Sequence, residues 1–197
     1  MKYLILLFLL FSQISFAQVY GTNPIDVNVI STVAASKIFY GASVSGLTVA
    51  ATATDIFSIS GSASKTIKIR KVEISATQTT LGQANIFLIK RSSADSNNST
   101  TSLTAVPFDS GSAAATAAVV SRTANPSSLG AAVGTIKSSR ILVPTLVGST
   151  DRLIYDFTGD ASESIVLRGT AETLNINLNA TTILGNNFNI SIEWTEE

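Results

Sequence analysis

Alternation of apolar and polar residues at every second position is the feature that most limits what this chain can fold into. It is clearest near the C-terminus, where the apolar set is Phe188, Ile190, Ile192 and Trp194. The residues between them are Asn189, Ser191 and Glu193. Because successive side chains of an extended strand point to opposite faces, this pattern predicts a strand over 188–194 with one buried and one solvated face.

Similar patterns, separated by turns rich in Gly, Ser and Asn, predict further strands at 27–33, 56–59, 66–76, 85–90, 141–143, 153–157, 165–167 and 174–178. The alternation changes phase at Arg70-Lys71, which predicts a β-bulge or a strand that passes from one sheet to another. Residues 85–90 (NIFLIK) are nearly all apolar, as in a central strand covered on both faces. Gly185-Asn186-Asn187 favours a turn, so the strands at 174–178 and 188–194 are predicted to form a hairpin.

The stretch 113–120 (AAATAAVV) is the one place where a helix competes with a strand, since alanine is the best helix former. Its β-branched valines and its lack of charge favour a strand. Residues 95–101 and 125–130 have the composition of exposed loops. The whole pattern predicts an all-β protein, a single antiparallel β-sandwich that is jelly-roll-like and spans 18–197, with 18–50 as a less regular N-terminal arm.

Residues 1–17 have the composition of a cleavable secretory signal peptide. Lys2 gives a basic start, residues 3–11 (YLILLFLLF) are apolar, and Ser15-Phe16-Ala17 places small residues at the −3 and −1 positions. Cleavage is therefore predicted between Ala17 and Gln18. A retained hydrophobic anchor is the alternative, although a stable membrane span needs about 20 apolar residues. The expected location is secreted or extracellular, with the periplasm, the cell surface and a virion as alternatives.

The composition excludes several kinds of chemistry. The chain has no cysteine and no histidine, so disulfides, thiolate nucleophiles, zinc–thiolate sites and the commonest general base are all missing. Its 13 basic and 13 acidic residues cancel, which gives no electrostatic reason to bind nucleic acid. Only carboxylate, lysine or serine–lysine chemistry stays open. We expect no catalytic residue and no cofactor.

Two charged clusters are candidate sites. Asp156, Asp160 and Glu163, with Asp151 nearby, offer the oxygen ligands that calcium prefers, but their spacing matches no known calcium loop. A solvated turn is the simpler interpretation, and calcium binding by this loop stays open. The basic run is Lys65, Lys68, Arg70 and Lys71. It indicates either a groove for a polyanion or, more simply, the polar outer face of a strand.

The remaining candidates are weaker. Ser62 and Lys65 have Ser-x-x-Lys spacing at a strand start rather than a helix start, which indicates coincidence. Trp194 is in phase with the apolar face, and Tyr20 and Tyr40 form no evident platform for sugar rings. The Asn-x-Ser/Thr sequons at Asn97, Asn98, Asn179 and Asn189 are expected from composition alone.

Six segments carry a resemblance when taken together: DIFSISGSASKTIKIRKVEISATQTT, LIKRSSAD, AVPFDSGSAAATAAV, TANPSSLG, IVLRGTAETLNINL and IEWTEE. The chain resembles a group of small, uncharacterised β-rich bacteriophage proteins, often virion-associated, and their exported relatives. The shared motifs are turns and strands, so the resemblance transfers no site residue. It implies a homo-oligomer in contact with other surface or virion proteins. The signal peptide favours an exported bacterial relative.

Together these observations predict a non-enzymatic exported structural or assembly protein, phage-related, that presents a β-sandwich on a particle, filament or cell surface. The alternative is a secreted ligand-binding module, with glycans as its ligands. A hydrolase is a third interpretation. An exposed aromatic platform would favour the glycan-binding module, and a buried carboxylate pair in a cleft would favour an enzyme.

Overall fold

A computed structural model describes residues 37–96, 99–145, 151–159 and 164–197. The signal peptide and the strand predicted at 27–33 lie outside these ranges, as do Tyr20, Asn97, Asn98, Asp160 and Glu163, so their predictions stay untested. The described residues form two antiparallel β-sheets and contain no helix. Within these ranges no helical segment has the length and apolar character that a membrane span requires.

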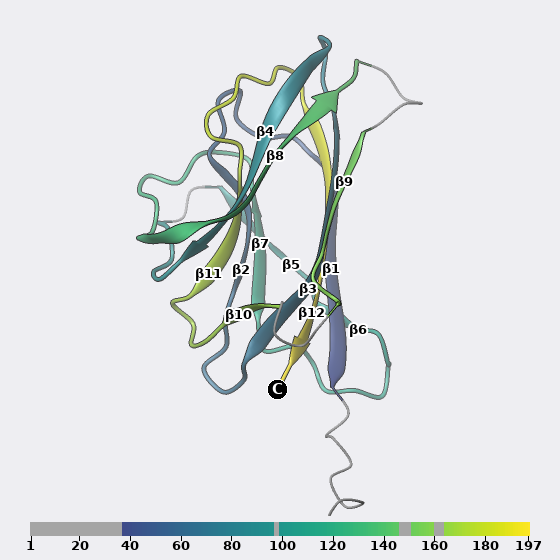
Figure 1. Ribbon diagram of the computed structural model, residues 1–197, viewed down its shortest axis with the longest axis vertical. Helices are drawn as coiled ribbons and strands as arrows, with labels where there is room; N and C mark the ends of the chain where they lie inside the picture. The colour runs from purple at the N-terminus through teal and green to yellow at the C-terminus, as the bar shows by residue number, and fades with distance from the viewer. Residues whose placement is uncertain (1–36, 97–98, 146–150, 160–163) are drawn as a thin grey trace, which may run out of the picture. The chain divides into compact units, whose positions relative to one another are not determined.

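The two sheets lie side by side in Figure 1. In spatial order, sheet A contains β10 (Ile165–Leu167), β3 (Ile67–Thr77), β12 (Asn187–Glu196), β1 (Ile38–Leu47) and β6 (Val106–Pro107), and β9 (Arg152–Asp156) also pairs with β3. Sheet B contains β5 (Thr100–Leu103), β7 (Ala118–Arg122), β2 (Asp55–Ser60), β11 (Thr173–Asn177), β4 (Gly82–Arg91) and β8 (Ala132–Val143).

The strand order is that of a jelly roll carrying an insertion. Without β5, β6 and β7, sheet A has the order β1-β12-β3 followed by β9 and β10, and sheet B has the order β2-β11-β4-β8. The first four described strands alternate between the sheets, and later strands enter between earlier ones, as in jelly rolls. The predicted fold class is confirmed. Residues 92–131, between β4 and β8, form the insertion, which adds β6 beside β1, places β7 beside β2 and pairs β5 with β7.

The core lies between the sheets, where β12 has the register predicted from sequence. Phe188, Ile190, Ile192 and Trp194 are buried. The phase change in β3 is a bulge, because Ile69 pairs with Trp194 and Lys71 pairs with Glu193, which leaves Arg70 without an opposite residue. The prediction of a bulge at Arg70-Lys71 is therefore confirmed.

The predicted hairpin of 174–178 with 188–194 is wrong. β11 pairs with β2 and β4 in sheet B, whereas β12 pairs with β1 and β3 in sheet A. The chain between them crosses the sandwich: Ile183 is fully buried, and the Asn186 side chain accepts the Val49 N–H at 2.7 Å and donates to the Val49 carbonyl at 3.0 Å. An asparagine in this turn thus ties the crossing segment to the chain just after β1 instead of turning a hairpin.

The structure differs from the sequence-based expectation in three other places. Within 113–120 only Ala118 onwards is a strand, because the N–H groups of Thr116 and Ala117 bond the Glu196 carboxylate instead of a neighbouring strand. β4 has one fully buried face, while Phe87 and Ile89 on the other face are half-buried. The arm proposed for 18–50 contains the regular strand β1, whose Tyr40 and Ala42 enter the core.

Candidate functional site

The acidic loop after β9 forms a turn in its described part. The Oδ1 of Asp156 accepts the Thr158 N–H at 2.8 Å, and the hydrogen bonds from Thr158 lower the pKa of Asp156. Asp151 instead accepts the N–H of Leu142 at 3.2 Å. In the described ranges no three acidic side chains come together as metal ligands. The described part of this loop therefore supports a turn.

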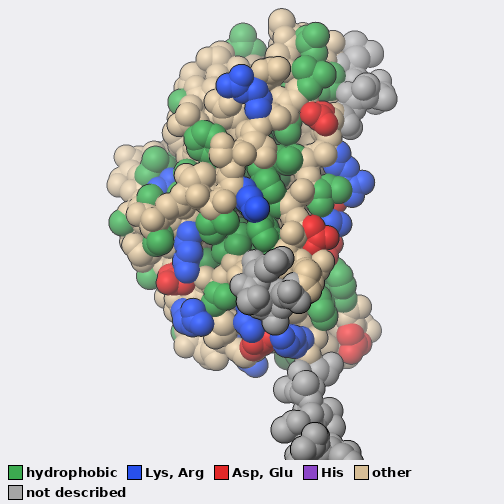
Figure 2. All heavy atoms as spheres, viewed as in Figure 1, with side chains coloured by type: hydrophobic (Ala, Val, Ile, Leu, Met, Phe, Trp, Pro, Cys, Tyr) green, Lys and Arg blue, Asp and Glu red, His purple; other side chains and the backbone are tan. Residues whose placement is uncertain are grey.

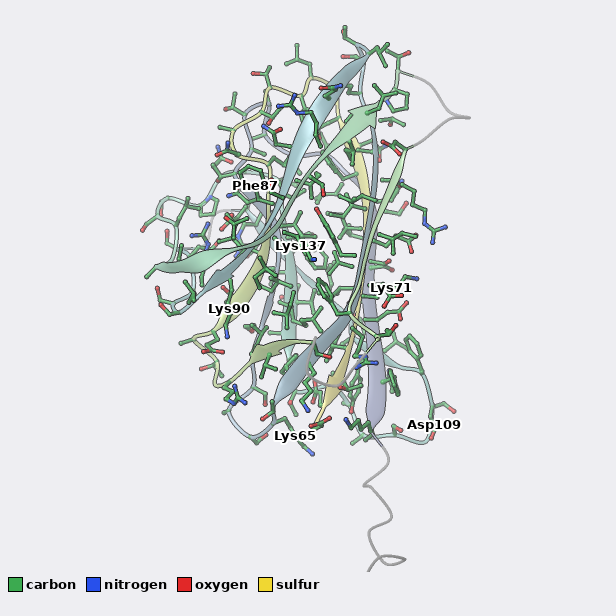
Figure 3. The ribbon with its side chains drawn as sticks, viewed as in Figure 1. Lys65, Lys71, Phe87, Lys90, Asp109 and Lys137 are labelled. Carbon is green, nitrogen blue, oxygen red and sulfur yellow. The ribbon has the colours of Figure 1, made fainter. Side chains whose placement is uncertain are left out.

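The basic run along β3 is interleaved with acids. Lys68 pairs with Glu197 at 2.6 Å. Lys71 lies 3.4 Å from Glu73 and 3.8 Å from Glu193, and points to the outer side of sheet A (Figure 3). The bulged Arg70 turns its guanidinium to Ser164 and to the Thr158 carbonyl. Two of these cations, Lys68 and Lys71, are paired with acids, and Arg70 is held by neutral oxygens, which favours a polar outer face over a groove for a polyanion.

The aromatic and serine candidates are occupied by structural contacts. Trp194 and Tyr40 are buried and stacked, with ring centroids 5.8 Å apart. The Ser62 hydroxyl accepts the Ser64 N–H at 3.2 Å, and Lys65 is exposed beside it. The Asn189 side chain accepts the Ser45 hydroxyl at 2.7 Å. Among the described positions, Tyr40 and Trp194 form no exposed aromatic platform, and Ser62 and Lys65 form no Ser–Lys pair.

A shallow groove runs over the outer face of sheet A, and sequence reasoning did not find it. One part, of about 320 Å³, is lined by Gly41, Ser43, Val106, Phe108, Ser191 and Glu193. A second part, of about 240 Å³, shares Ser43 and Ser191 and continues to Ser45, Ser75 and Asn189. The floor therefore consists mainly of glycine and small hydroxyl side chains from β1 and β12.

Exposed apolar side chains close one end of this groove. Phe39, Val106 and Phe108, which we call the Phe108 patch, are 41%, 57% and 63% exposed. The two phenylalanine rings stack with centroids 6.3 Å apart. Phe108 lies against Gly41, where an added Cβ would come within 3.0 Å of its ring, and its N–H donates to the Phe39 carbonyl at 2.9 Å. A fixed backbone contact thus holds the patch on the sheet.

The charges beside the groove are paired with one another. Glu73 accepts Arg152 at 2.6 Å and lies near Lys71, and these partners, Arg152 above all, lower the pKa of Glu73. On the face shown in Figure 2, positive and negative side chains are interspersed. Asp109, in the loop that follows β6, lies at the far end of the same side of sheet A (Figure 3). The groove has no single sign of charge to attract an ionic ligand.

Sheet B carries a buried charge network that sequence reasoning also missed. The guanidinium of Arg91 donates to both oxygens of Asp55, at 3.0 and 3.1 Å, and to the Gly130 carbonyl at 2.8 Å. Asn177 donates to the same carboxylate at 2.5 Å. Asp95, which the sequence predicts in an exposed loop, is instead buried and accepts Arg122 at 2.6 Å. Asp55, Arg91 and Arg122 lie at strand ends, but nothing in the sequence indicates that they are buried or which of them pair.

No protein-family model, curated protein or solved structure matches this chain. The resemblance to bacteriophage proteins therefore stays a prediction. Because a fold such as the jelly roll hosts many functions, function has to come from the surfaces and sites of this chain itself.

Proposed function

We propose that this protein is a non-enzymatic exported structural protein that assembles with copies of itself through the outer face of sheet A. The observation that carries the proposal is the Phe108 patch at the end of the groove. Monomeric soluble proteins rarely expose contiguous large apolar side chains, and such patches mark interaction surfaces. Aromatic residues are enriched in the cores of protein interfaces.

The chemistry of the groove favours a second copy of the chain as the partner. The charges beside it are paired, and the whole chain has 13 acidic and 13 basic residues, so like surfaces do not repel each other. Ser43, Ser45 and Ser191 on its floor lose little side-chain entropy when another surface approaches. Assemblies of identical chains are usually closed and symmetric.

The long edge strand β8 is a poorer assembly surface. Its pairing with β4 is interrupted by bulges at Ile136 and near Val133, and it carries Lys137 and Arg140. Bulges and positive charges are the devices by which edge strands avoid pairing with other chains. We therefore assign self-assembly to the face of sheet A rather than to this edge.

Two of the described carboxylates, Glu73 and Asp55, support a non-enzymatic role. Glu73 is engaged by Lys71 and Arg152, and Asp55 by Arg91 and Asn177. A general acid or base needs to be free to reach a substrate, whereas these groups are held by structural partners. The signal peptide at 1–17 supports export, and a particle, filament or cell surface is the setting in which we place the assembly.

Thiol footprinting tests the assembly surface, because the natural chain has no cysteine. In Val106→Cys, the new thiol should be alkylated slowly at high protein concentration and quickly after dilution. Leu81→Cys is the matched control, since Leu81 is 62% exposed in the turn between β3 and β4 and lines neither part of the groove. Its alkylation rate should not depend on concentration. Equal concentration dependence in both variants, or none in Val106→Cys, would contradict the proposal.

A further inference from the structure

We propose that a hollow on the outer face of sheet B binds one neutral sugar residue. The hollow has a volume of about 170 Å³. Its polar walls are Ser58 and Ser60 of β2, Asp95, Arg122 of β7, Thr170 and Thr173. The side chains between these on β2 and β7, such as Phe57, Ile59 and Val119, enter the core, so the hollow faces away from it. It lies on a different sheet from the Phe108 patch, and the two proposals are independent.

The hollow contains a buried ion pair that is incompletely bonded. Arg122 is 2% exposed and Asp95 is 9% exposed. Arg122 uses Nη2 to bond Asp95 Oδ1 at 2.6 Å and Nη1 to bond Ser58 Oγ at 2.9 Å. The Oδ2 of Asp95 and the Nε of Arg122 are buried and have no hydrogen-bond partner in the described part of the chain.

An unpaired buried polar atom costs about 1–3 kcal/mol, so folded proteins nearly always supply it with a partner. Here the acceptor Asp95 Oδ2 and the donor Arg122 Nε both lack a partner, and both residues line the same hollow. A bound molecule that both donates and accepts hydrogen bonds would satisfy both. A hydroxyl group both donates and accepts hydrogen bonds, whereas a simple anion or cation does not do both.

The charge balance around the hollow also favours a neutral ligand. Asp95 and Arg122 cancel, and the neighbouring pair of Asp55 and Arg91 cancels as well. Burial raises the pKa of Asp95, Arg122 opposes that rise, and Asp55 adds to it. An anion in the hollow would meet the Asp95 carboxylate, and a cation would meet the Arg122 guanidinium. Neither is favoured over a neutral polyhydroxylated molecule.

The size of the hollow fits one small ring. At roughly 30 Å³ per water molecule, its volume would hold about six waters. It is smaller than the roughly 300–1,000 Å³ of sites for drug-sized ligands. In the proposed complex one hydroxyl donates to Asp95 Oδ2 and a neighbouring one accepts from Arg122 Nε, which requires these two solvent-inaccessible atoms to turn toward the hollow. Ser60 and Thr170 lie on its wall. Ala118 and Val120 provide apolar wall for the carbon–hydrogen face of the ring.

Ligand-observed NMR on the full mature protein tests the proposal. The probes are the methyl glycosides of glucose, galactose, mannose and N-acetylglucosamine, titrated to saturation. At least one should bind saturably. Ala118→Phe, which fills the hollow from an exposed position on β7, should weaken that binding at least tenfold. The matched control Ala114→Phe, at an exposed alanine outside the hollow, should leave it unchanged.

Asp95→Asn keeps the shape of the side chain but removes its charge, and it should also weaken binding at least tenfold. Circular dichroism confirms that each variant is folded. Glycans immobilised by their reducing ends distinguish the source of the sugar: if they bind as well as the free glycosides, the ligand is the end of a glycan, and if only the glycosides bind, it is a free sugar. No binding of any free glycoside, or binding that survives Ala118→Phe, overturns the proposal and leaves a hollow filled by water.

Discussion

Glu196 shows how a single buried carboxylate organises one end of the sandwich. It accepts the indole N–H of Trp194 at 3.1 Å, the Thr116 hydroxyl at 2.6 Å and the Ala117 N–H at 3.0 Å. Burial by itself raises the pKa of Glu196, but these hydrogen bonds outweigh it, so the pKa lies below its ordinary value. The carboxylate thereby fixes residues 116–117 of the insertion to the last strand.

Replacing this carboxylate should destabilise the fold. Glu196→Gln puts an amide N–H₂ among donors, so we expect a loss of about 2–3 kcal/mol in the free energy of unfolding, as for hydrogen bonds to a charged group. Urea denaturation measures it. Glu193→Gln is the control, because Glu193 lies on the outer face, 3.8 Å from Lys71. Its effect should stay within about 0.5 kcal/mol. Equal losses at both positions would contradict the role given to Glu196.

The same carboxylate predicts a pH dependence. A carboxyl group with a lower pKa in the folded than in the unfolded state stabilises the fold above its unfolded pKa of about 4.3. That contribution is lost as pH falls through the folded pKa. Glu73 and Glu197 have pKa values shifted in the same direction, and Asp95 in the opposite one. Urea titrations at pH values from about 6 down to about 3 should therefore show stability falling with acid, less steeply in Glu196→Gln. Parallel curves would contradict this.

At the scale of elements, alternation predicted individual strands well and their partners poorly. β12, β9, β10 and the bulge in β3 follow from local side-chain periodicity, which a strand carries in its own sequence. Pairing is not local: β11 and β12 are consecutive in sequence but lie in different sheets. The asparagines of β11 alternate like solvent-facing residues, yet Asn175 and Asn177 are buried.

The candidate sites were harder to predict for the same reason. Phe108 lies beside β1 only because the insertion adds β6 there. Asp95 pairs with Arg122, which is distant from it in the sequence. Neither position differs in sequence from an ordinary loop or strand end. Composition alone could say that no histidine or cysteine site exists.

The register of β12 gives a test at this scale. Ile190 is buried between the sheets, whereas Ser191 lies on the outer face beside the groove. Ile190→Ala should lower the free energy of unfolding by about 2–5 kcal/mol because it leaves a cavity. Ser191→Ala should change it by less than about 0.5 kcal/mol. Similar losses measured by urea denaturation would reject the register.

At the scale of the whole molecule, the insertion at 92–131 is the feature that distinguishes this jelly roll. It supplies Val106 and Phe108 to the outer face of sheet A, and Asp95 and Arg122 to the hollow of sheet B. The sandwich holds it through Arg91, which ties Gly130 to Asp55. Both proposed surfaces therefore depend on one segment of chain set on a stable scaffold.

Sedimentation velocity of the mature protein across micromolar concentrations tests the central claim of self-assembly most directly. The wild-type chain should sediment as a discrete oligomer that dissociates on dilution. Phe108→Ser should shift it to the monomer at the same concentration, while Leu81→Ser, a substitution of an equally exposed residue, should not. A wild-type chain that sediments as a monomer at every concentration, or a Phe108→Ser variant that assembles like wild type, would contradict assembly through the face of sheet A.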